Sequence, residues 1–228
     1  MLVYGRNVAK ELLESHSKIE KIIIQNGFSD KEIVDLIYKS SIKCSYVDKK
    51  ILDKKVNGNH QGILLYIPDY KYSDISCINS SSFVVVLDHL EDPYNFGAII
   101  RSCVAFGVDT IIIPKDRSVS VNSTVMKVST GLLNKINICL VSNIGYSLDK
   151  LKDAGFWIIG ASMNGTLINE CDFSFEKKCL VIGNEGSGIS SLVLKKCDII
   201  TKIPMENGVD SLNASVSAGI LIYEIIRR

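Results

Sequence analysis

The sequence contains no C-x-x-C pair and only three histidines, His16, His60 and His89, which stand far apart. Zinc sites are built from cysteine and histidine pairs at short spacing, so no metal is expected. The seven cysteines are an odd number and are spread along the chain. This usage predicts reduced, buried thiols in the cytoplasm and no disulfide framework.

Long apolar runs and an excess of charge of one sign are also lacking. No unbroken apolar stretch reaches the roughly 18 residues that a membrane span needs. The 26 basic and 25 acidic residues nearly cancel, and residues 1–14 carry charges where a signal peptide would be apolar. We expect a cytoplasmic protein without membrane contact, in which any nucleic-acid contact comes from a local patch.

The chain is long enough for two cores of unequal size. It has 228 residues, of which 46% are hydrophobic. Residues 1–70 alternate helix-like and strand-like apolar patterns, which is typical of a small α/β domain. Residues 71–82 are polar and rich in serine, as exposed connectors are, so a second domain is expected at 83–228.

The second domain shows five short apolar runs in which β-branched residues are frequent. Segments long enough for helices separate the runs, and this alternation predicts a buried parallel sheet. The expected strands lie at 83–87, 110–113, 156–161, 180–182 and 199–203.

Polar loops with glycine follow three of these strands, at 88–97, 183–188 and 204–213. The carboxyl ends of parallel strands lie on one edge of a sheet, where ligands bind in open α/β folds, so the three loops should share one site. The glycines match neither the phosphate-loop pattern nor G-x-G-x-x-G, which weakens nucleotide-binding interpretations. Ser187 stands one residue short of the G-x-S-x-G elbow, so a hydrolase has little support.

Two loops offer candidate functional side chains. Asn95 suits an N-cap, and the apolar stripe of the following helix leaves Arg101 about 130° from its centre, free to face the loops. A lone arginine is more often a solvated surface residue. Glu185 is equally compatible with a strand-to-helix turn, where the helix dipole favours a carboxylate.

The third loop leads into the last helix of the chain. Ser211 or Asn213 can cap this helix, which is expected to reach Ile226. Small residues at 214–219 would let another backbone pack closely against its first turns. Such close packing fits either the core of the domain or a dimer interface.

Taken together, these segments resemble the SpoU (TrmH-type) family of SPOUT methyltransferases. The resemblance rests on DPYNFGAIIR at 92–101, VIGNEGSG at 181–188, and IPM at 203–205 followed by SLN at 211–213. YGRNV at 4–8 and HQGI at 60–63 extend it to the N-terminal part, which is similar to the L30e-type RNA-binding domain of some members.

The resemblance implies a particular fold and assembly. The C-terminal domain would be a SPOUT-type α/β domain with a parallel sheet and a deep C-terminal trefoil knot, a rare exception to the rule against knotted chains. A small L30e-like α/β domain would precede it. The resemblance also implies a homodimer whose site is completed across the interface.

The activity implied is S-adenosylmethionine-dependent methylation of a ribose 2′-hydroxyl in RNA. The adenosine part of the cofactor would be held by the backbone around Gly183, Ile203 and Leu212. The target ribose would face Asn95, Arg101, Glu185, Ser211 and Asn213. The family assigns the arginine as general base, but a guanidinium accepts protons poorly. A grip on the adjacent phosphate or on the developing alkoxide is the alternative.

The N-terminal domain favours one substrate. In this family an L30e-type domain precedes the catalytic domain of the bacterial 23S rRNA guanosine enzymes and is usually absent from the tRNA enzymes. The expected target is therefore a guanosine in the peptidyl-tRNA-binding loop of 23S rRNA. The alternatives are a tRNA guanosine 2′-O-methyltransferase, an rRNA adenosine enzyme of the antibiotic-resistance kind, and a non-catalytic RNA-binding factor on the same fold.

Overall fold

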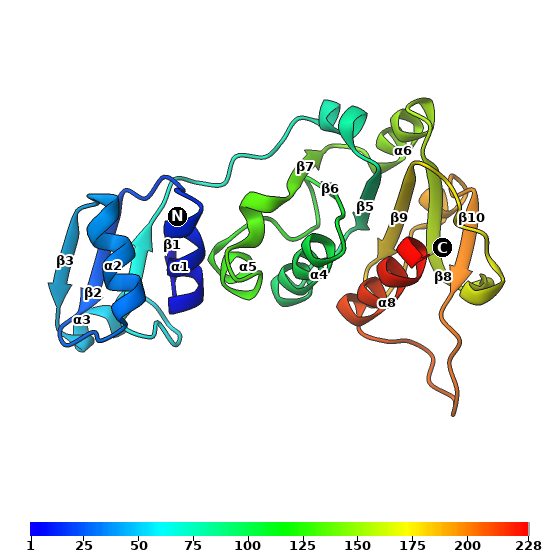
Figure 1. Cartoon of the computed structure of the whole chain (residues 1–228). Coiled ribbons are helices and arrows are strands. Elements are labelled where there is room, and N and C mark those ends of the chain that lie inside the picture. The colour runs from blue at the N-terminus through cyan, green and yellow to red at the C-terminus, as the bar shows by residue number, and fades with distance from the viewer. Residues whose placement is uncertain (228) are drawn as a thin grey trace. The chain divides into compact units, whose positions relative to one another are not determined.

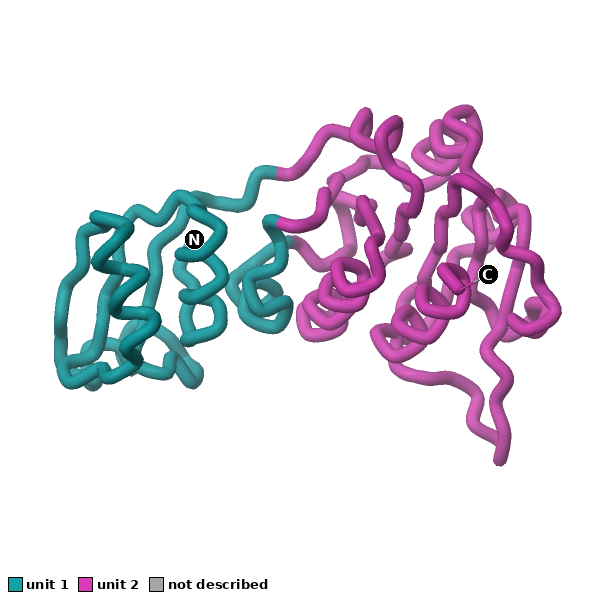
Figure 2. Tube along the Cα trace, in the orientation of Figure 1, with its two compact units in different colours: residues 1–71, 121–134 teal, residues 72–120, 135–228 magenta. Residues whose placement is uncertain are grey.

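The computed structural model describes residues 1–227, which form two compact units (Figure 1, Figure 2). The first unit combines Met1–Lys71 with Val121–Asn134. The second combines Tyr72–Ser120 with the chain from Lys135 onward. The polypeptide therefore leaves the second unit once, contributes a short helical segment to the first, and returns.

The first unit is built on a four-stranded sheet in the order β1-β4-β2-β3. The strands are β1 (Leu2–Tyr4), β4 (Ile63–Tyr66), β2 (Lys21–Gln25) and β3 (Cys44–Val47). β4 runs antiparallel to both neighbours, whereas β2 and β3 are parallel. The helices are α1 (Arg6–Glu14), α2 (Lys31–Ser40), α3 (Lys49–Asp53) and α5 (Ser123–Val128). This mixed sheet confirms a small N-terminal α/β domain.

The second unit contains a six-stranded sheet in the order β10-β8-β9-β5-β6-β7, in which every neighbouring pair is parallel. The carboxyl ends of all six strands therefore lie on one edge. The strands are β5 (Phe83–Asp88), β6 (Thr110–Pro114), β7 (Asn137–Val141), β8 (Trp157–Leu167), β9 (Lys178–Gly183) and β10 (Ile199–Lys202).

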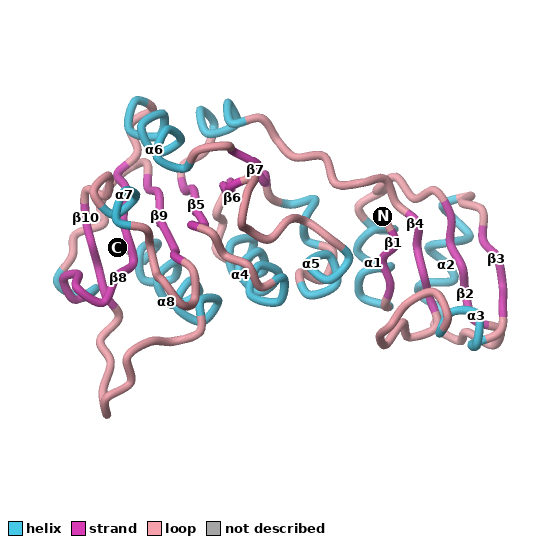
Figure 3. The backbone as a smooth tube through the Cα atoms, turned by 180° about the vertical axis from the view of Figure 1, so that it is seen from behind, coloured by secondary structure: helices cyan, strands magenta, loops and turns pink. Residues whose placement is uncertain are grey.

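Helices cover both faces of this sheet, as a buried parallel sheet requires (Figure 1, Figure 3). One face packs on α6 (Ile144–Asp153), α7 (Ser191–Leu194) and the 3₁₀ helix η1 (Ile75–Ser80) in a shared apolar core. The opposite face carries α4 (Pro93–Ala105) and α8 (Ala214–Arg227), which pack against each other. Shorter 3₁₀ helices lie at η2 (Leu132–Lys135) and η3 (Ile168–Glu170).

All five strands expected in the second domain are present, and the parallel α/β fold is confirmed. β7 was not expected, because this edge strand starts with a polar residue and only two adjacent residues in it, Ile138 and Cys139, are buried. β8 extends to Leu167, beyond the expected end at 161, and its last residues pair with β10 after a register shift. Threading of the C-terminal segment as a knot stays a prediction.

All seven cysteines are free thiols. Cys103, Cys139 and Cys179 are buried, as expected, whereas the other four are partly exposed. Burial raises the pKa of Cys103 and of Cys179 above the ordinary thiol range. Burial, and then the charge of Asp198, raises the pKa of Cys197 to about 11. These thiols are therefore protonated at neutral pH and poor nucleophiles. No helix within residues 1–227 has the length and apolar character of a membrane span.

Candidate active site

The three polar loops meet at the carboxyl edge of the parallel sheet, as the strand order requires. A cavity of about 550 Å³ opens there, within the roughly 300–1,000 Å³ of small-molecule sites. Its wall includes the whole 183–188 loop, together with Ile203, Ser211 and Leu212 from the third loop. The structure thus brings together five of the eight residues that the sequence indicated, namely Gly183, Glu185, Ile203, Ser211 and Leu212.

The 183–188 loop is a tight, self-bonded turn. Asn184 and Gly188 exchange two backbone hydrogen bonds of 3.1 and 2.9 Å, and the Asn184 side-chain oxygen accepts the Gly186 N–H at 2.9 Å. A Cβ atom on Gly183 would lie 2.1 Å from the Gly188 carbonyl carbon. Only glycine fits at position 183, because the loop folds back directly over that backbone.

A buried carboxylate anchors this loop to the neighbouring strand. Asp88, at the end of β5, is 1% exposed, and its Oδ2 accepts the Ser190 N–H at 2.8 Å. Its Oδ1 lies 2.6 Å from His89 Nδ1, and the His89 carbonyl accepts a 2.8 Å hydrogen bond from the Asn184 side chain. The sequence analysis did not single out Asp88, although a carboxylate that ends an apolar strand was an available signal.

The N-cap assignment of Asn95 is wrong. The cap of α4 is Asp92, whose carboxylate accepts the N–H groups of Tyr94 at 3.0 Å and of Asn95 at 3.3 Å. Pro93 follows at the first helical position, where its missing N–H costs nothing. Asn95 therefore lies within the first turn, and its side-chain amide donates a 2.8 Å hydrogen bond to Glu185 Oε1.

This hydrogen bond joins the first loop to the second across 90 residues of sequence. Asn95 is only 7% exposed, whereas Glu185 is exposed to solvent at the cavity wall. The amide holds one carboxylate oxygen and leaves the other available to a ligand. A fixed negative charge beside the cavity favours a ligand that carries positive charge.

Asn213 caps α8, one of the two alternatives that the sequence left open. Its side-chain oxygen accepts the Ser215 N–H at 2.9 Å and the Ser215 hydroxyl at 2.6 Å. Within residues 1–227 its amide nitrogen has no partner, so its two N–H donors remain available. Asn213 does not itself line the cavity, but both of its neighbours, Leu212 and Ala214, do.

The sequence analysis missed one wall of the cavity, formed by residues 161–164 of β8. Met163 in this segment is 48% exposed. β8 was expected to end at 161, so no loop was assigned to its carboxyl end. The parallel order was the available signal, because it brings the end of every strand to the same edge.

Arg101 does not line the cavity. It lies on the exposed side of α4, as its position off the apolar stripe predicts, and makes no side-chain hydrogen bond or ion pair within residues 1–227. Its charge is therefore available to a ligand or to another chain. Over the same residues, no three His, Cys, Asp or Glu side chains gather in a way that could hold a metal ion.

Comparison with known proteins assigns the chain to a family. Residues 82–223 match the SpoU rRNA Methylase family, and residues 2–73 match the domain described as RNA 2′-O ribose methyltransferase substrate binding. The fold, the three loops and these matches agree. The chain belongs to the SpoU family of RNA ribose methyltransferases.

Relatives of the same length support this assignment. A protein of Staphylococcus haemolyticus assigned to the TrmH family of tRNA/rRNA methyltransferases is 39% identical, covering 100% of this chain and 96% of its own length. A Bacillus subtilis protein with the same assignment is 36% identical, covering 99% and 95%.

Solved structures share the fold of the whole chain. The SpoU methyltransferase AviRb of Streptomyces viridochromogenes, solved with AdoMet, aligns with a TM-score of 0.83 at 24% identity, covering 100% of this chain and 89% of its own. An AdoMet-bound rRNA methyltransferase of Sinorhizobium meliloti aligns with a TM-score of 0.84 at 21% identity, covering 99% and 86%.

Proposed function

We propose that this protein transfers the methyl group of S-adenosylmethionine to the 2′-hydroxyl of a guanosine in the peptidyl-tRNA-binding loop of 23S rRNA. The observation that carries the proposal is the cavity at the carboxyl edge of the sheet: the second and third family segments line it, and Asn95 of the first is hydrogen-bonded to Glu185 in its wall. The division of labour proposed is an RNA-binding domain at 1–70, a linker at 71–82 and a catalytic domain at 83–228. Such a substrate would place the protein in the cytoplasm.

The cavity wall suits this cofactor. Ile203 and Leu212 offer apolar surface for an adenine ring, while the close backbone at Gly183 presents N–H and C=O groups to a nucleoside. Glu185 adds a carboxylate to the same wall, which would favour the positively charged cofactor. When bound, S-adenosylmethionine supplies a methyl group activated by its sulfonium.

The chain's own task is then to orient the ribose and to help the hydroxyl proton leave. Glu185 is held by Asn95, and the free amide group of Asn213 can donate to a ribose oxygen. Ser211 adds a hydroxyl at the same wall. Arg101 would stabilise the developing alkoxide or grip the adjacent phosphate, because its guanidinium is a poor base but a strong bidentate donor.

A homodimer would place Arg101 at the interface between two chains. α8 exposes an apolar stripe made of Val216, Ile220 and Tyr223, and the Tyr223 ring lies 5.6 Å from that of Phe106 just beyond α4. Exposed apolar stripes of this kind mark protein contacts. Arg101 lies on the exposed side of the adjacent α4, so a second copy docked on this stripe would cover the arginine.

Coverage of known structures supports rRNA over tRNA. The TrmH/SpoU tRNA modifying enzyme of A. aeolicus aligns with 67% of this chain, at 28% identity and a TM-score of 0.58. The rRNA methyltransferase of Sinorhizobium meliloti aligns with 99% of it. The third of this chain that the tRNA enzyme leaves uncovered is similar in length to the region at 2–73 that matches the substrate-binding domain.

Parallel assays with purified 23S rRNA fragments and bulk tRNA test the substrate. With methyl-labelled S-adenosylmethionine, we expect incorporation into the fragment that contains the peptidyl-tRNA-binding loop and background incorporation into tRNA. The reverse pattern would assign the protein to tRNA. Binding of RNA without any transfer would instead indicate a non-catalytic factor.

A further inference from the structure

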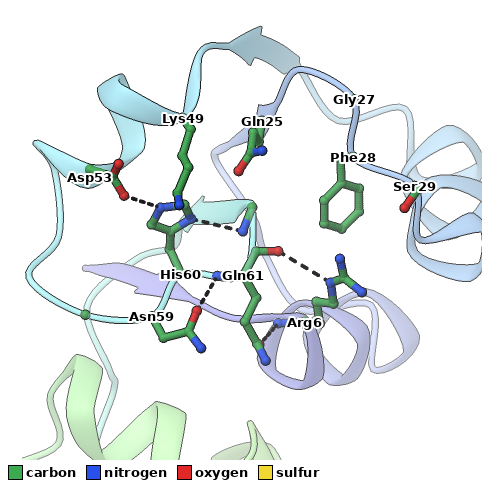
Figure 4. Close-up of a pocket in the computed structure, with 12 residues that line it drawn as sticks. Arg6, Gln25, Gly27, Phe28, Ser29, Lys49, Asp53, Asn59, His60 and Gln61 are labelled. Carbon is green, nitrogen blue, oxygen red and sulfur yellow. Dashed lines mark hydrogen bonds and ion pairs between the residues drawn. The ribbon is translucent and has the colours of Figure 1, made fainter.

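A second cavity, of about 520 Å³, lies within the N-terminal unit (Figure 4) and shares no lining residue with the cavity at the sheet edge. It opens between the start of α1, the turn after β2, α3 and the loop before β4. The functional groups at its wall include Arg6, Phe28, Lys49, Asn59 and Gln61. One phenyl ring, two cations and three carboxamides, with Gln25 as the third, therefore surround a space large enough for a nucleoside-sized group.

A buried histidine fixes one wall of this cavity. His60 is 5% exposed, its Nδ1 accepts the Gly62 N–H at 2.9 Å, and its Nε2 lies 2.9 Å from Asp53 Oδ1 (Figure 4). Since Nδ1 accepts, the ring proton belongs on Nε2, which donates to the carboxylate. The network locks the turn at residues 60–62, including Gln61 in the left-handed conformation with a φ of 53°. A non-glycine residue persists there only when its surroundings enforce it.

That turn holds Arg6 over an aromatic ring. Gln61 accepts the Arg6 backbone N–H through its side-chain oxygen at 2.8 Å and the Arg6 Nε–H through its carbonyl at 3.4 Å. The guanidinium carbon then lies 5.1 Å from the centre of the Phe28 ring. Gly62 makes room for the ring, because a Cβ atom there would approach Phe28 to 2.9 Å. The amide nitrogen of Gln61 keeps both of its N–H donors free within residues 1–227.

We propose that this cavity, termed the Arg6–Phe28 pocket, captures one unpaired nucleobase of the RNA substrate, an inference that rests on the proposed RNA substrate. A planar guanidinium beside an aromatic ring offers stacking surface for a base of any sequence. The carboxamides of Gln61 and Asn59 can form hydrogen bonds with a base edge, and the Lys49 ammonium can pair with the adjoining phosphate. Paired bases cannot enter such a pocket, because their edges remain within the duplex.

The ligand class follows from the balance of these groups. Two cations are partly offset by carboxylates, since Arg6 lies 3.7 Å from Asp30 and Asp53 lines the same wall. A free phosphate would be attracted only weakly by this net charge and would make no use of the Phe28 ring. A nucleobase with its backbone phosphate uses the ring, the amides and the remaining positive charge together.

Binding to RNA without cofactor tests the proposal on the full-length protein. The probe is a fluorescent RNA hairpin with a randomised nine-nucleotide loop, compared by anisotropy with a fully paired duplex of equal length. We expect the hairpin to bind at least tenfold more tightly than the duplex. Phe28→Ala and Arg6→Ala should each weaken hairpin binding by on the order of tenfold and leave duplex binding unchanged.

Matched controls remove an exposed ring and an exposed cation from the far end of α2. Tyr38→Ala and Lys39→Ala should bind the hairpin like the unmodified protein. If Phe28→Ala does not fold, Phe28→Leu keeps the apolar volume but removes the stacking ring and should weaken binding to a similar degree. Pocket variants that bind the hairpin like the controls would overturn the proposal, as would equal binding of hairpin and duplex by the unmodified protein.

Failure of the proposed enzymatic function would give a different result. The binding experiment contains no S-adenosylmethionine, so loss of methyl transfer with intact hairpin selectivity would count against the methyltransferase proposal alone. Pocket variants that lose the hairpin should still bind S-adenosylmethionine in calorimetry, because the Arg6–Phe28 pocket shares no residue with the cavity at the sheet edge.

Discussion

Among single residues, the candidate site combines buried side chains held by hydrogen bonds with one exposed guanidinium that has no partner within residues 1–227. Asp88 and Asn95 are buried and hold the 183–188 loop through Ser190 and Glu185. Arg101 is exposed and has no partner within residues 1–227. A guanidinium without an internal partner contributes little to folding, so its removal should affect function and leave stability unchanged.

Arg101→Ala should lower methyl transfer by on the order of 100-fold or more, because an electrostatic donor to the reacting centre is lost. The dissociation constant of S-adenosylmethionine, measured by calorimetry, should not change. Arg101→Lys should recover only part of the activity, because an ammonium cannot form a bidentate contact. Lys39→Ala serves as the charge control, and near-normal turnover of Arg101→Ala would refute the role.

Gly183→Val should abolish cofactor binding, because even a Cβ atom at this position would lie 2.1 Å from backbone atoms of the same loop. Gly145→Ala is the control, since its added Cβ would approach only side-chain atoms of Asn143 and Lys196, at 3.3 Å, and no backbone atom. Calorimetry with S-adenosylmethionine reports the affinity of each variant, and thermal melting reports its folding. Full affinity in Gly183→Val would mean that the loop has another conformation in solution.

The sequence identified these residues better than it identified their roles. Motif order indicated Gly183 and Glu185, and parallel-strand geometry predicted that the loops would meet. The cap at Asp92 was missed because Asp and Asn are about equally favoured as N-caps. Only Pro93 distinguishes them, since proline is favoured at the first helical position, directly after the cap. Met163 was missed because the length of β8 depends on its pairing with β10, which is a tertiary effect.

At the scale of elements, α8 links the site to the core. Its buried face carries Ala218, Leu221 and Ile225, while its first residue follows the third loop directly. Because the helix is packed in the core, it fixes the position of its cap residue and of the loop residues next to the cap. Asn213 is therefore both the cap of α8 and a candidate donor to the ribose.

Asn213→Ala should destabilise the protein by about 1 kcal/mol through loss of the cap, which corresponds to a fall in Tm of roughly 2–4 °C. Asn213→Ser should restore the Tm, because a serine hydroxyl can accept the same N–H groups. Methyl transfer should stay low in both variants, since neither has an amide to donate. A serine variant with full activity would confine Asn213 to capping.

Elements with a strong apolar sequence pattern were predicted correctly, whereas elements that depend on contacts with distant segments were missed. The five apolar runs became strands because burial on both faces requires continuous apolar sequence. β7 and α5 escaped notice because an edge strand and a two-turn helix need little apolar sequence of their own. α5 is stabilised by packing on β1 of the first unit, a contact that no local pattern reports.

For the whole molecule, we propose that one unit binds RNA and the other transfers the methyl group. One carries the Arg6–Phe28 pocket, and the other carries the cavity at the sheet edge together with the exposed stripe of α8. The apolar patterns on either side of a polar segment at 71–82 predicted two domains. The sequence could not predict that residues 121–134 join the first unit, because chain excursions of this kind depend on long-range packing.

The protein should be a dimer in solution, with a mass twice the 25.2 kDa of one chain by light scattering. Ile220→Glu places a charge in the exposed stripe of α8 and should give monomers that lose methyl transfer. Tyr38→Glu places the same charge on an exposed ring of the other unit and should remain dimeric and active. A monomeric, fully active Ile220→Glu variant would contradict a site completed by two chains.

The position of the transferred methyl group tests the central claim most directly. The purified protein is incubated with labelled S-adenosylmethionine and 23S rRNA, the RNA is digested to nucleosides, and the products are identified by mass spectrometry. We expect a single labelled nucleoside, guanosine methylated on the ribose 2′-oxygen. Label on a base, or no labelled nucleoside from RNA that the protein binds, would contradict it.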